Sequence, residues 1–159
     1  MRRNIKITSI LFGLLVGIVF FILLPYFFVQ LNSYFSLPVY SSKLFTILGM
    51  ISMIIGENLF IYCSRLFLVF GQGTPVPIKP PKKLVVNDLY RYSRNPIYIS
   101  YFMIFLGEFL FFGQLLLLIY FFLSLIGINY YVKYYEEPVL KERFGKSYKE
   151  YFKKIPRWL

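Results

Sequence analysis

The chain of 159 residues contains no histidine and a single cysteine, Cys63. Without histidine there is no imidazole to act as a general base or zinc ligand, and no Ser-His or Cys-His pair. One cysteine excludes an internal disulfide and a CxxC-type metal site. Acidic residues are also scarce, 7 against 18 lysines and arginines. These absences argue against a hydrolase or a metalloenzyme, and the sequence predicts no metal site.

Apolar residues are abundant instead, since 58% of the chain is hydrophobic and 22% is aromatic. A soluble domain of this length has too little interior to bury 19 phenylalanines and 15 tyrosines, so the apolar surface needs lipid as its solvent. The sequence therefore predicts an all-α integral membrane protein in contact with the lipid bilayer, long enough for one domain.

Four apolar segments are predicted to form transmembrane helices. The last two are separated only by Gly113 and Gln114, which predicts a tight helical hairpin. Pro25 is a candidate kink in the first span, and Leu31–Lys43 is a polar, turn-prone link. The four segments are Ile7–Val29, Leu44–Phe70, Ile97–Phe112 and Leu115–Tyr131.

Two acidic residues fall inside these apolar segments. A charged side chain at the centre of a span costs ~2.5–3.5 kcal/mol, so we expect Glu57 to face protein or a wet cavity. It would serve there either as a site wall or in an interhelical hydrogen bond. Glu108 lies near the far end of the third span, where we expect it to be solvated.

Two basic segments differ from the rest. Gly71–Asn95 is rich in proline and cannot continue the preceding helix, so it predicts an ordered loop or a linker. Lys133–Leu159 has apolar residues at spacings of three and four, which predicts an amphipathic helix lying on the membrane. The residues of this apolar stripe are Leu140, Phe144, Tyr148, Tyr151, Phe152 and Ile155.

The basic residues predict the orientation. With four crossings, the first six residues, the loop and the tail lie on one side of the membrane. They hold all of the 18 basic residues except Lys43 and Arg65, and Arg65 lies near the inner end of its helix. By the positive-inside rule, the chain is a multi-pass protein of the cell membrane with both termini in the cytoplasm.

The hairpin would bring the end of the loop, Arg94–Tyr98, next to the start of the tail, Tyr134–Pro138. Carboxylates, an arginine, an asparagine and tyrosines at one membrane boundary suit a cationic or zwitterionic ligand. The residues alone leave a second reading open, in which the tyrosines and arginine anchor the chain at the interface and Glu136 and Glu137 offset nearby lysines. The sequence GQGTPV lacks the third glycine of a dinucleotide loop.

Three blocks follow one another from Gly71 to Trp158: GxGTPxPxxPPxxLV, YRxxRNPxYxx and EEPxLxxxFGxxYxxYxxxIPRW. In these blocks the chain resembles prokaryotic members of the isoprenylcysteine carboxyl methyltransferase family, and its C-terminal half is similar to phospholipid N-methyltransferases. The resemblance implies membrane helices that enclose S-adenosylmethionine without a soluble Rossmann-type domain. It divides the chain into two N-terminal transmembrane helices, 1–70, and a methyltransferase half, 71–159.

The resemblance also implies site residues. Glu136 is expected to bind the amino group of the methyl donor and to act in catalysis with Glu137 and Arg94. Lys133 is a weak candidate for the substrate, because the family's substrate arginine has no counterpart at Val132. The implied cofactor residues are Lys82, Lys83, Leu84, Val85, Tyr90, Asn95, Pro96, Ile97, Tyr98 and Glu136.

Three positions depart from the family pattern. Asn95 replaces a common histidine; an asparagine keeps the capacity for hydrogen bonding but does not titrate, so we expect no proton transfer at this position. Asp88 replaces a glycine, and aspartate is among the few residues that tolerate a positive φ. Ser100 replaces a glycine and is expected to narrow a helix contact.

The predicted function is methyl transfer from S-adenosylmethionine to a lipophilic substrate, an isoprenylcysteine-type carboxylate or a related one, at the cytoplasmic face. A carboxylate acceptor needs no base, which agrees with the lack of histidine. The alternatives are a phospholipid or small-molecule N- or S-methyltransferase of the same fold and a non-catalytic four-helix binding protein. A small transporter fits poorly because no internal repeat is present. The apolar stripe of the tail argues against nucleic acid as a partner, and the oligomeric state is left open.

Overall fold

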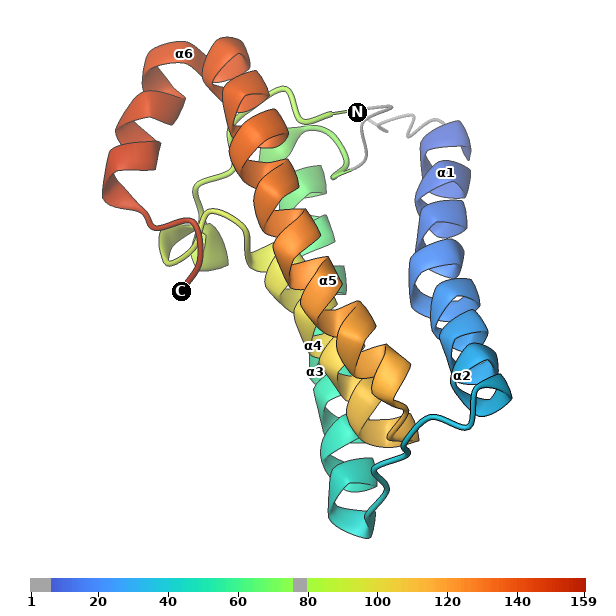
Figure 1. The fold of residues 1–159 in the computed structure, drawn as a ribbon. Helices are drawn as coiled ribbons and strands as arrows, with labels where there is room; N and C mark the ends of the chain where they lie inside the picture. The colour runs from blue at the N-terminus through green and yellow to red at the C-terminus, as the bar shows by residue number, and fades with distance from the viewer. Residues whose placement is uncertain (1–6, 76–79) are drawn as a thin grey trace.

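The computed structural model describes residues 7–75 and 80–159, which are helical and contain no named strand. This confirms the predicted all-α class. The basic residues Arg2, Arg3, Lys6 and Lys79, used above for orientation, lie outside the described residues. The elements are α1 (Ile7–Ile18), η1 (Val19–Leu23), α2 (Leu24–Tyr34), α3 (Lys43–Leu66), η2 (Phe67–Gly71), η3 (Asp88–Arg91), α4 (Pro96–Phe112), α5 (Leu115–Tyr131), η4 (Val132–Glu136) and α6 (Glu137–Lys154) (Figure 1).

Within the described part of the chain, three helices are long and apolar enough to cross a membrane. They are Leu11–Tyr34, Lys43–Gly71 and Leu115–Lys154, while Pro96–Phe112 is apolar but shorter. The start of α1, the loop after α3 and the bend of α6 lie at one end of the molecule (Figure 1). These long apolar helices confirm a membrane protein.

The first span is longer than predicted, because helical structure continues from α1 through the π-helical η1 to Tyr34. The prediction that a turn-prone link begins at Leu31 was therefore wrong. Asn32 is fully buried: its Nδ2 donates to the Leu37 carbonyl at 3.0 Å, and its Oδ1 accepts from the Leu116 amide at 3.0 Å. Tertiary partners thus satisfy a polar side chain whose sequence context suggested a turn.

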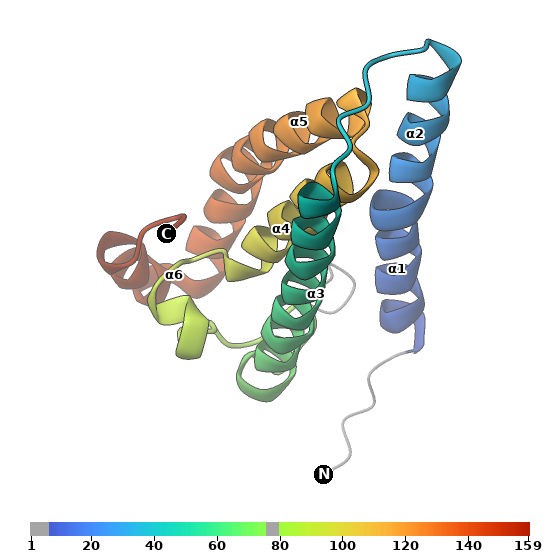
Figure 2. The same cartoon turned by 90° about the horizontal axis from the view of Figure 1, so that it is seen from below.

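Helices α3 and α4 approach each other almost backbone to backbone (Figure 2). A Cβ atom at Gly49 would lie 2.7 Å from the Gly107 carbonyl oxygen, and one at Gly56 would lie 2.9 Å from the Ser100 carbonyl oxygen. Small residues give such close contact between membrane helices, where dispersion must replace hydrophobic exclusion from water. The serine at position 100 therefore fits because a glycine stands opposite it.

The predicted hairpin is present, with α4 ending at Gly113 in a left-handed conformation (φ 70°). The link from α2 pairs with this turn, since the Tyr40 amide donates to the Gly113 carbonyl at 2.7 Å. Glu108 is 5% exposed, so the prediction of a solvated carboxylate was wrong. Helix α4, which carries Glu108, packs against α3 and α5, so this part of α4 is covered by other helices.

The C-terminal region differs most from the expectation. Helix α5 does not stop near Tyr131 but continues through the π-helical η4 into α6, which bends at Gly145 (φ 53°, ψ −123°). Tyr148 and Tyr151 are buried, and Leu140 and Phe144 line an internal cavity. The helix is amphipathic as predicted, but these stripe residues pack on protein, because the bend at Gly145 turns the chain back (Figure 1).

Glu57 also lies elsewhere than predicted. Its side chain is exposed on the outside of α3, so neither the expected site wall nor the expected interhelical hydrogen bond is formed within this chain. The face of α3 that contacts α4 is taken instead by small residues such as Gly56.

Candidate functional site

A cavity of about 1470 Å³ runs between α1, α4, α5, α6 and the loop that precedes α4. One end is polar and includes Arg94, Asn95 and Glu136. The other end is apolar and lies between α1 and α5. Its apolar lining includes Phe12, Val16, Phe20, Phe21, Phe105, Tyr120, Leu123, Gly127 and Ile128.

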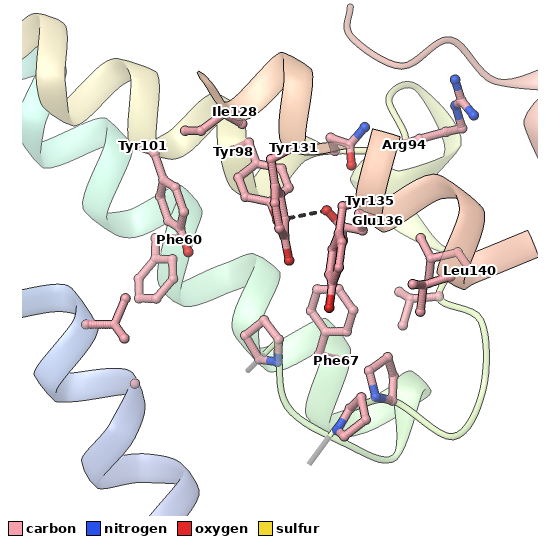
Figure 3. Close-up of a pocket in the computed structure, with 18 of the residues that line it drawn as sticks. Phe60, Phe67, Arg94, Tyr98, Tyr101, Ile128, Tyr131, Tyr135, Glu136 and Leu140 are labelled. Atoms are coloured by element: carbon pink, nitrogen blue, oxygen red, sulfur yellow. Dashed lines mark hydrogen bonds between the residues drawn. The ribbon is translucent and has the colours of Figure 1, made fainter. Parts of the chain in front are cut away.

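Glu136 and Tyr98 form the contact at the polar end. The Tyr98 hydroxyl donates to Glu136 Oε2 at 2.8 Å (Figure 3). Tyr98 comes from the first turn of α4 and Glu136 from the last residue of η4, so the hairpin brings them together. Glu136 is half-buried and lines the cavity. The result is a hydrogen-bonded carboxylate at the polar end of the cavity.

Aromatic rings surround this carboxylate. Tyr131 and Tyr135 stack with ring centroids 5.3 Å apart, and Tyr98 meets Tyr101 edge-on at 5.6 Å. In Figure 3, the side chains of Tyr98, Tyr131, Tyr135 and Glu136 lie close together, and Tyr101 lies farther toward α1. The faces of aromatic rings attract cations. This end of the cavity therefore combines a negative charge with several electron-rich rings.

Glu137 contacts arginines, unlike the adjacent Glu136. Arg157 donates to it through two nitrogens, Nε to Oε1 at 2.8 Å and Nη2 to Oε2 at 3.0 Å. Arg94 Nη2 lies 3.1 Å from Oε1. The Glu137 side chain is 4% exposed and does not line the cavity. The hydrogen bond to Glu137 raises the pKa of Arg157. Glu137 is thus the shared partner of two arginines.

Arg94 lies between this ion pair and the cavity. Its guanidinium carbon is 3.9 Å from the centroid of the Phe152 ring, and its side chain is 7% exposed. Two of its nitrogens, Nε and Nη1, are buried without a hydrogen-bond partner in the described part of the chain. A buried charged donor without a partner is costly. Arg94 also lines the cavity, so its positive charge favours an anionic group of a ligand at this end.

The C-terminal residues close one side of the site. The Arg157 carbonyl accepts from Ser93 Oγ and from Asn95 Nδ2, both at 3.1 Å, and the Arg94 amide donates to the Pro156 carbonyl at 3.0 Å. Trp158 Nε1 donates to Asn129 Oδ1 at 3.1 Å. Asn95, which stands where the resemblance places histidine, therefore holds the C-terminal segment against the loop.

The loop is also fixed from α6. The Tyr151 hydroxyl donates to the Tyr90 carbonyl at 2.6 Å. Tyr90 is 3% exposed, and burial raises the pKa of its phenol well above the usual value. Asp88, just before it, has a φ of 53°. The expectation that this aspartate adopts the positive φ of a glycine is confirmed.

The predicted site residues separate into two groups. Those that line the cavity are Leu84, Val85, Tyr90, Arg94, Asn95, Tyr98 and Glu136. The others lie outside it: Lys82, Lys83 and Lys133 are exposed, Pro96 and Ile97 are buried in the start of α4, and Glu137 is in its ion pair. Val132, at the position of the family's substrate arginine, is fully buried.

Sequence reasoning missed several cavity residues. Most are apolar residues of α6, whose spacing had been interpreted as a membrane-facing stripe; the others include Tyr131 at the end of α5 and Arg143. The missed residues are Tyr131, Leu140, Arg143, Phe144 and Tyr148. Among the residues that the structure describes, no group of three or more His, Cys, Asp or Glu side chains is placed to hold a metal ion.

The fold and the cavity define a helical membrane protein with a polar site at one end of an apolar chamber. Residues 44–147 match the phospholipid methyltransferase family. This match covers more than half of the chain, and the chain belongs to that family of membrane methyltransferases. No curated protein and no solved structure matches the chain significantly.

Proposed function

We propose that this chain transfers a methyl group from S-adenosylmethionine to a lipophilic substrate at the cytoplasmic face of the cell membrane. The observation that carries the proposal is that one cavity joins a charged end at Glu136 and Arg94 to an apolar end between α1 and α5. A charged donor and a lipid acceptor require these two environments side by side. The loop, η4 and α6 bind the donor within residues 71–159, and α1 encloses the acceptor.

The residues of the polar end fit the donor. Its amino-acid part carries an ammonium and a carboxylate: Glu136 pairs with the ammonium, and the positive charge of Arg94 attracts the carboxylate. Leu84, Val85 and Tyr90 line the same cavity and contact the remainder of the donor. When bound, the donor supplies a methyl group on a positively charged sulfur. Tyr98, Tyr131 and Tyr135 present rings to this charge.

The acceptor proposed here is a carboxylate on an apolar chain, of the isoprenylcysteine type. A carboxylate reaches the site already ionised and needs no base to remove a proton. The chain has no histidine, and Glu137 is held by two arginines. The remaining carboxylate of the polar end, Glu136, is assigned to the donor. An apolar, desolvated cavity favours a reaction in which opposite charges are neutralised.

A second candidate acceptor is the amine of an ethanolamine phospholipid, which the family match favours. An amine must lose a proton before or during transfer. Glu136 is the carboxylate in reach for that purpose, and using it as a base would remove it from donor binding. A carboxylate acceptor therefore leaves Glu136 free to bind the donor, whereas an amine acceptor would require Glu136 as the base.

The donor site is tested by calorimetric titration of the detergent-purified protein with S-adenosylhomocysteine. Charge-assisted hydrogen bonds contribute about 1.5–3 kcal/mol, so Glu136→Gln should weaken binding about 10- to 150-fold. Arg94→Lys should weaken it as well, because a single ammonium does not replace the guanidinium fork. Glu150→Gln, an exposed position on α6, is the matched control. Binding by Glu136→Gln as tight as by the control would refute the assignment.

The acceptor is tested with labelled donor and two lipids, a farnesylated cysteine and a phosphatidylethanolamine, in the same vesicles. Label in a base-labile methyl ester supports the carboxylate acceptor. Label in a base-stable phospholipid headgroup would show that the acceptor is the amine and not the carboxylate. No transfer to either lipid by protein that binds S-adenosylhomocysteine would refute both acceptors while retaining the donor site.

A further inference from the structure

The long helix that begins as α5 changes its register where it reaches the polar end of the cavity. In η4 the amide of Glu137 donates to the carbonyl of Val132, five residues earlier, whereas an α-helix would use the carbonyl four residues earlier. A π-helical turn of this kind holds one more residue than the α-helical turn that it interrupts. We call this the extra residue of η4. It lies between the part of the helix that lines the apolar end of the cavity and the part that lines the polar end.

The cavity residues of α5 define the direction of the cavity from the helix axis. They fall within an arc of about 140° on a helix of 3.6 residues per turn. If the α-helix continued without interruption, Glu136 would point about 150° away from the centre of this arc, to the far side of the helix. The residues that define the arc are Tyr120, Leu123, Ser124, Gly127, Ile128 and Tyr131.

The extra residue of η4 turns the following part of the helix back by about 100°. Glu136 then points about 50° from the centre of the arc, and Glu137 points about 150° from it. These directions agree with the observed contacts, since Glu136 lines the cavity and Glu137 meets Arg94 and Arg157. One additional residue in the helix therefore sends the two adjacent carboxylates to opposite sides.

Two residues of α6 give an independent check on this register. Val139 and Arg143 both line the cavity. In an uninterrupted α-helix they would point about 90° and about 130° from the centre of the arc, whereas with the extra residue both lie within about 30° of it. The change of register at η4 therefore places a whole face of α6 on the cavity, together with Glu136.

Pro138 accounts for the wider turn at this place. It is the second residue of α6 and has no amide hydrogen. In a regular α-helix its ring would clash with the carbonyl of Tyr134, four residues earlier, and a π-helical turn relieves such a clash. The ion pairs of Glu137 hold the same register, because they require this side chain to point away from the cavity.

We propose that the extra residue of η4 aims Glu136 at the ammonium of the methyl donor, and that Pro138 is a positioning residue that maintains this arrangement. The inference rests on the proposed function, because only a bound donor gives the direction of Glu136 a consequence. Pro138 acts through Glu136 and does not itself contact the donor. What matters is the number of residues in the turn: without the proline, a helix one residue shorter keeps Glu136 on the cavity side as a regular α-helix.

Three variants of the full chain test this by calorimetric titration with S-adenosylhomocysteine. Pro138→Ala should weaken binding about 3- to 30-fold, because only the molecules that keep the π-helical turn bind the donor. Deleting Tyr134 as well, a residue that is 57% exposed and does not line the cavity, should restore binding. The matched control combines Pro138→Ala with one alanine inserted after Tyr134. It should bind about 10- to 150-fold more weakly than the parent, because the charge-assisted hydrogen bond of Glu136 is lost.

A second readout needs no change in the length of the helix. In Val139→Cys, a water-soluble thiol reagent should react more slowly when S-adenosylhomocysteine is bound. Glu150→Cys, exposed on the same helix, should react at one rate with and without the ligand. The native Cys63 is fully buried and provides the background. Circular dichroism and the fluorescence of Trp158 should show that all variants keep the fold of the parent.

The outcomes separate this inference from the proposed function. Equally weak binding by the shortened and the lengthened variants, or Pro138→Ala binding as tightly as the parent, would overturn the inference and leave the donor site standing. Unchanged labelling at position 139 in protein that binds S-adenosylhomocysteine would overturn it too. A parent chain that does not bind S-adenosylhomocysteine would remove the proposed function, and the inference with it.

Discussion

Replacing Glu137 with glutamine tests the assignment of the two adjacent glutamates to different tasks. The Glu137 carboxylate is 4% exposed and neutralises Arg94, which is 7% exposed, and Arg157, which is 23% exposed. Glutamine keeps the shape of the side chain and removes its charge, so two guanidinium groups lose their counter-ion. Breaking a buried ion pair by removing one partner costs about 3–5 kcal/mol. We expect the lower part of this range, because Arg157 can recruit water.

The free energy of unfolding can be measured in mixed micelles by titration with a denaturing detergent. Trp158, the single tryptophan, contacts Asn129 and Phe102, so its fluorescence reports whether the C-terminal segment stays docked. Circular dichroism reports the helices as a whole. In Glu137→Gln the fluorescence transition should move to lower detergent than the helical one, because Arg157 belongs to the segment that is released.

Two comparisons make this result interpretable. Glu150→Gln, exposed on the same helix, should change the free energy of unfolding by no more than about 0.5 kcal/mol. Adding Arg157→Met to Glu137→Gln should cost less than the sum of the single changes, by about 0.5–3 kcal/mol. A Glu137→Gln protein as stable as the Glu150→Gln protein would refute the anchoring role and return Glu137 to the candidates for catalysis.

Two further predictions follow from the packing and the site. Gly107→Ala should lower the free energy of unfolding by about 1–3 kcal/mol in the same titration, since its Cβ would lie 2.6 Å from Met53 Cγ. Gly127→Ala, with nothing within 4 Å of its Cβ, should not. Gly127→Phe fills the apolar end of the cavity, so it should reduce turnover of a farnesylated acceptor more than affinity for S-adenosylhomocysteine. An equal loss of both would contradict the proposed lipid chamber.

The local features of the chain were readable from its sequence. Apolar runs of the required length predicted the membrane helices, and the separation of two runs by Gly113 and Gln114 predicted the hairpin. The residues at the start of α4 and around Glu136 were also brought together by that hairpin alone. Tyr98 and Glu136 are 38 positions apart, but both lie at the open end of the hairpin of α4 and α5. Such contacts depend on helix length and connection, which a sequence displays directly.

The sequence did not show which face of each helix contacts protein and which contacts lipid. A repeat of apolar residues at three and four indicates an amphipathic helix and does not say whether lipid or protein covers its apolar side. The stripe that contains Tyr148 and Tyr151 was therefore interpreted as a membrane contact, although these residues pack on the loop. The same limit applies to Glu57, whose cost in lipid predicted a partner within the chain and whose side chain points outward.

By itself, the sequence determined the class of the protein, the positions of its apolar helices and the residues gathered at one membrane boundary. Only the tertiary structure separated Glu136 from Glu137. Adjacent residues on a helix point about 100° apart, so one carboxylate lines the cavity and the other meets Arg94 and Arg157. Arg157 reaches Glu137 because Gly145 bends α6 and returns the C-terminus to the loop. A contact of that kind depends on where the whole chain folds back, which no local pattern of residues specifies.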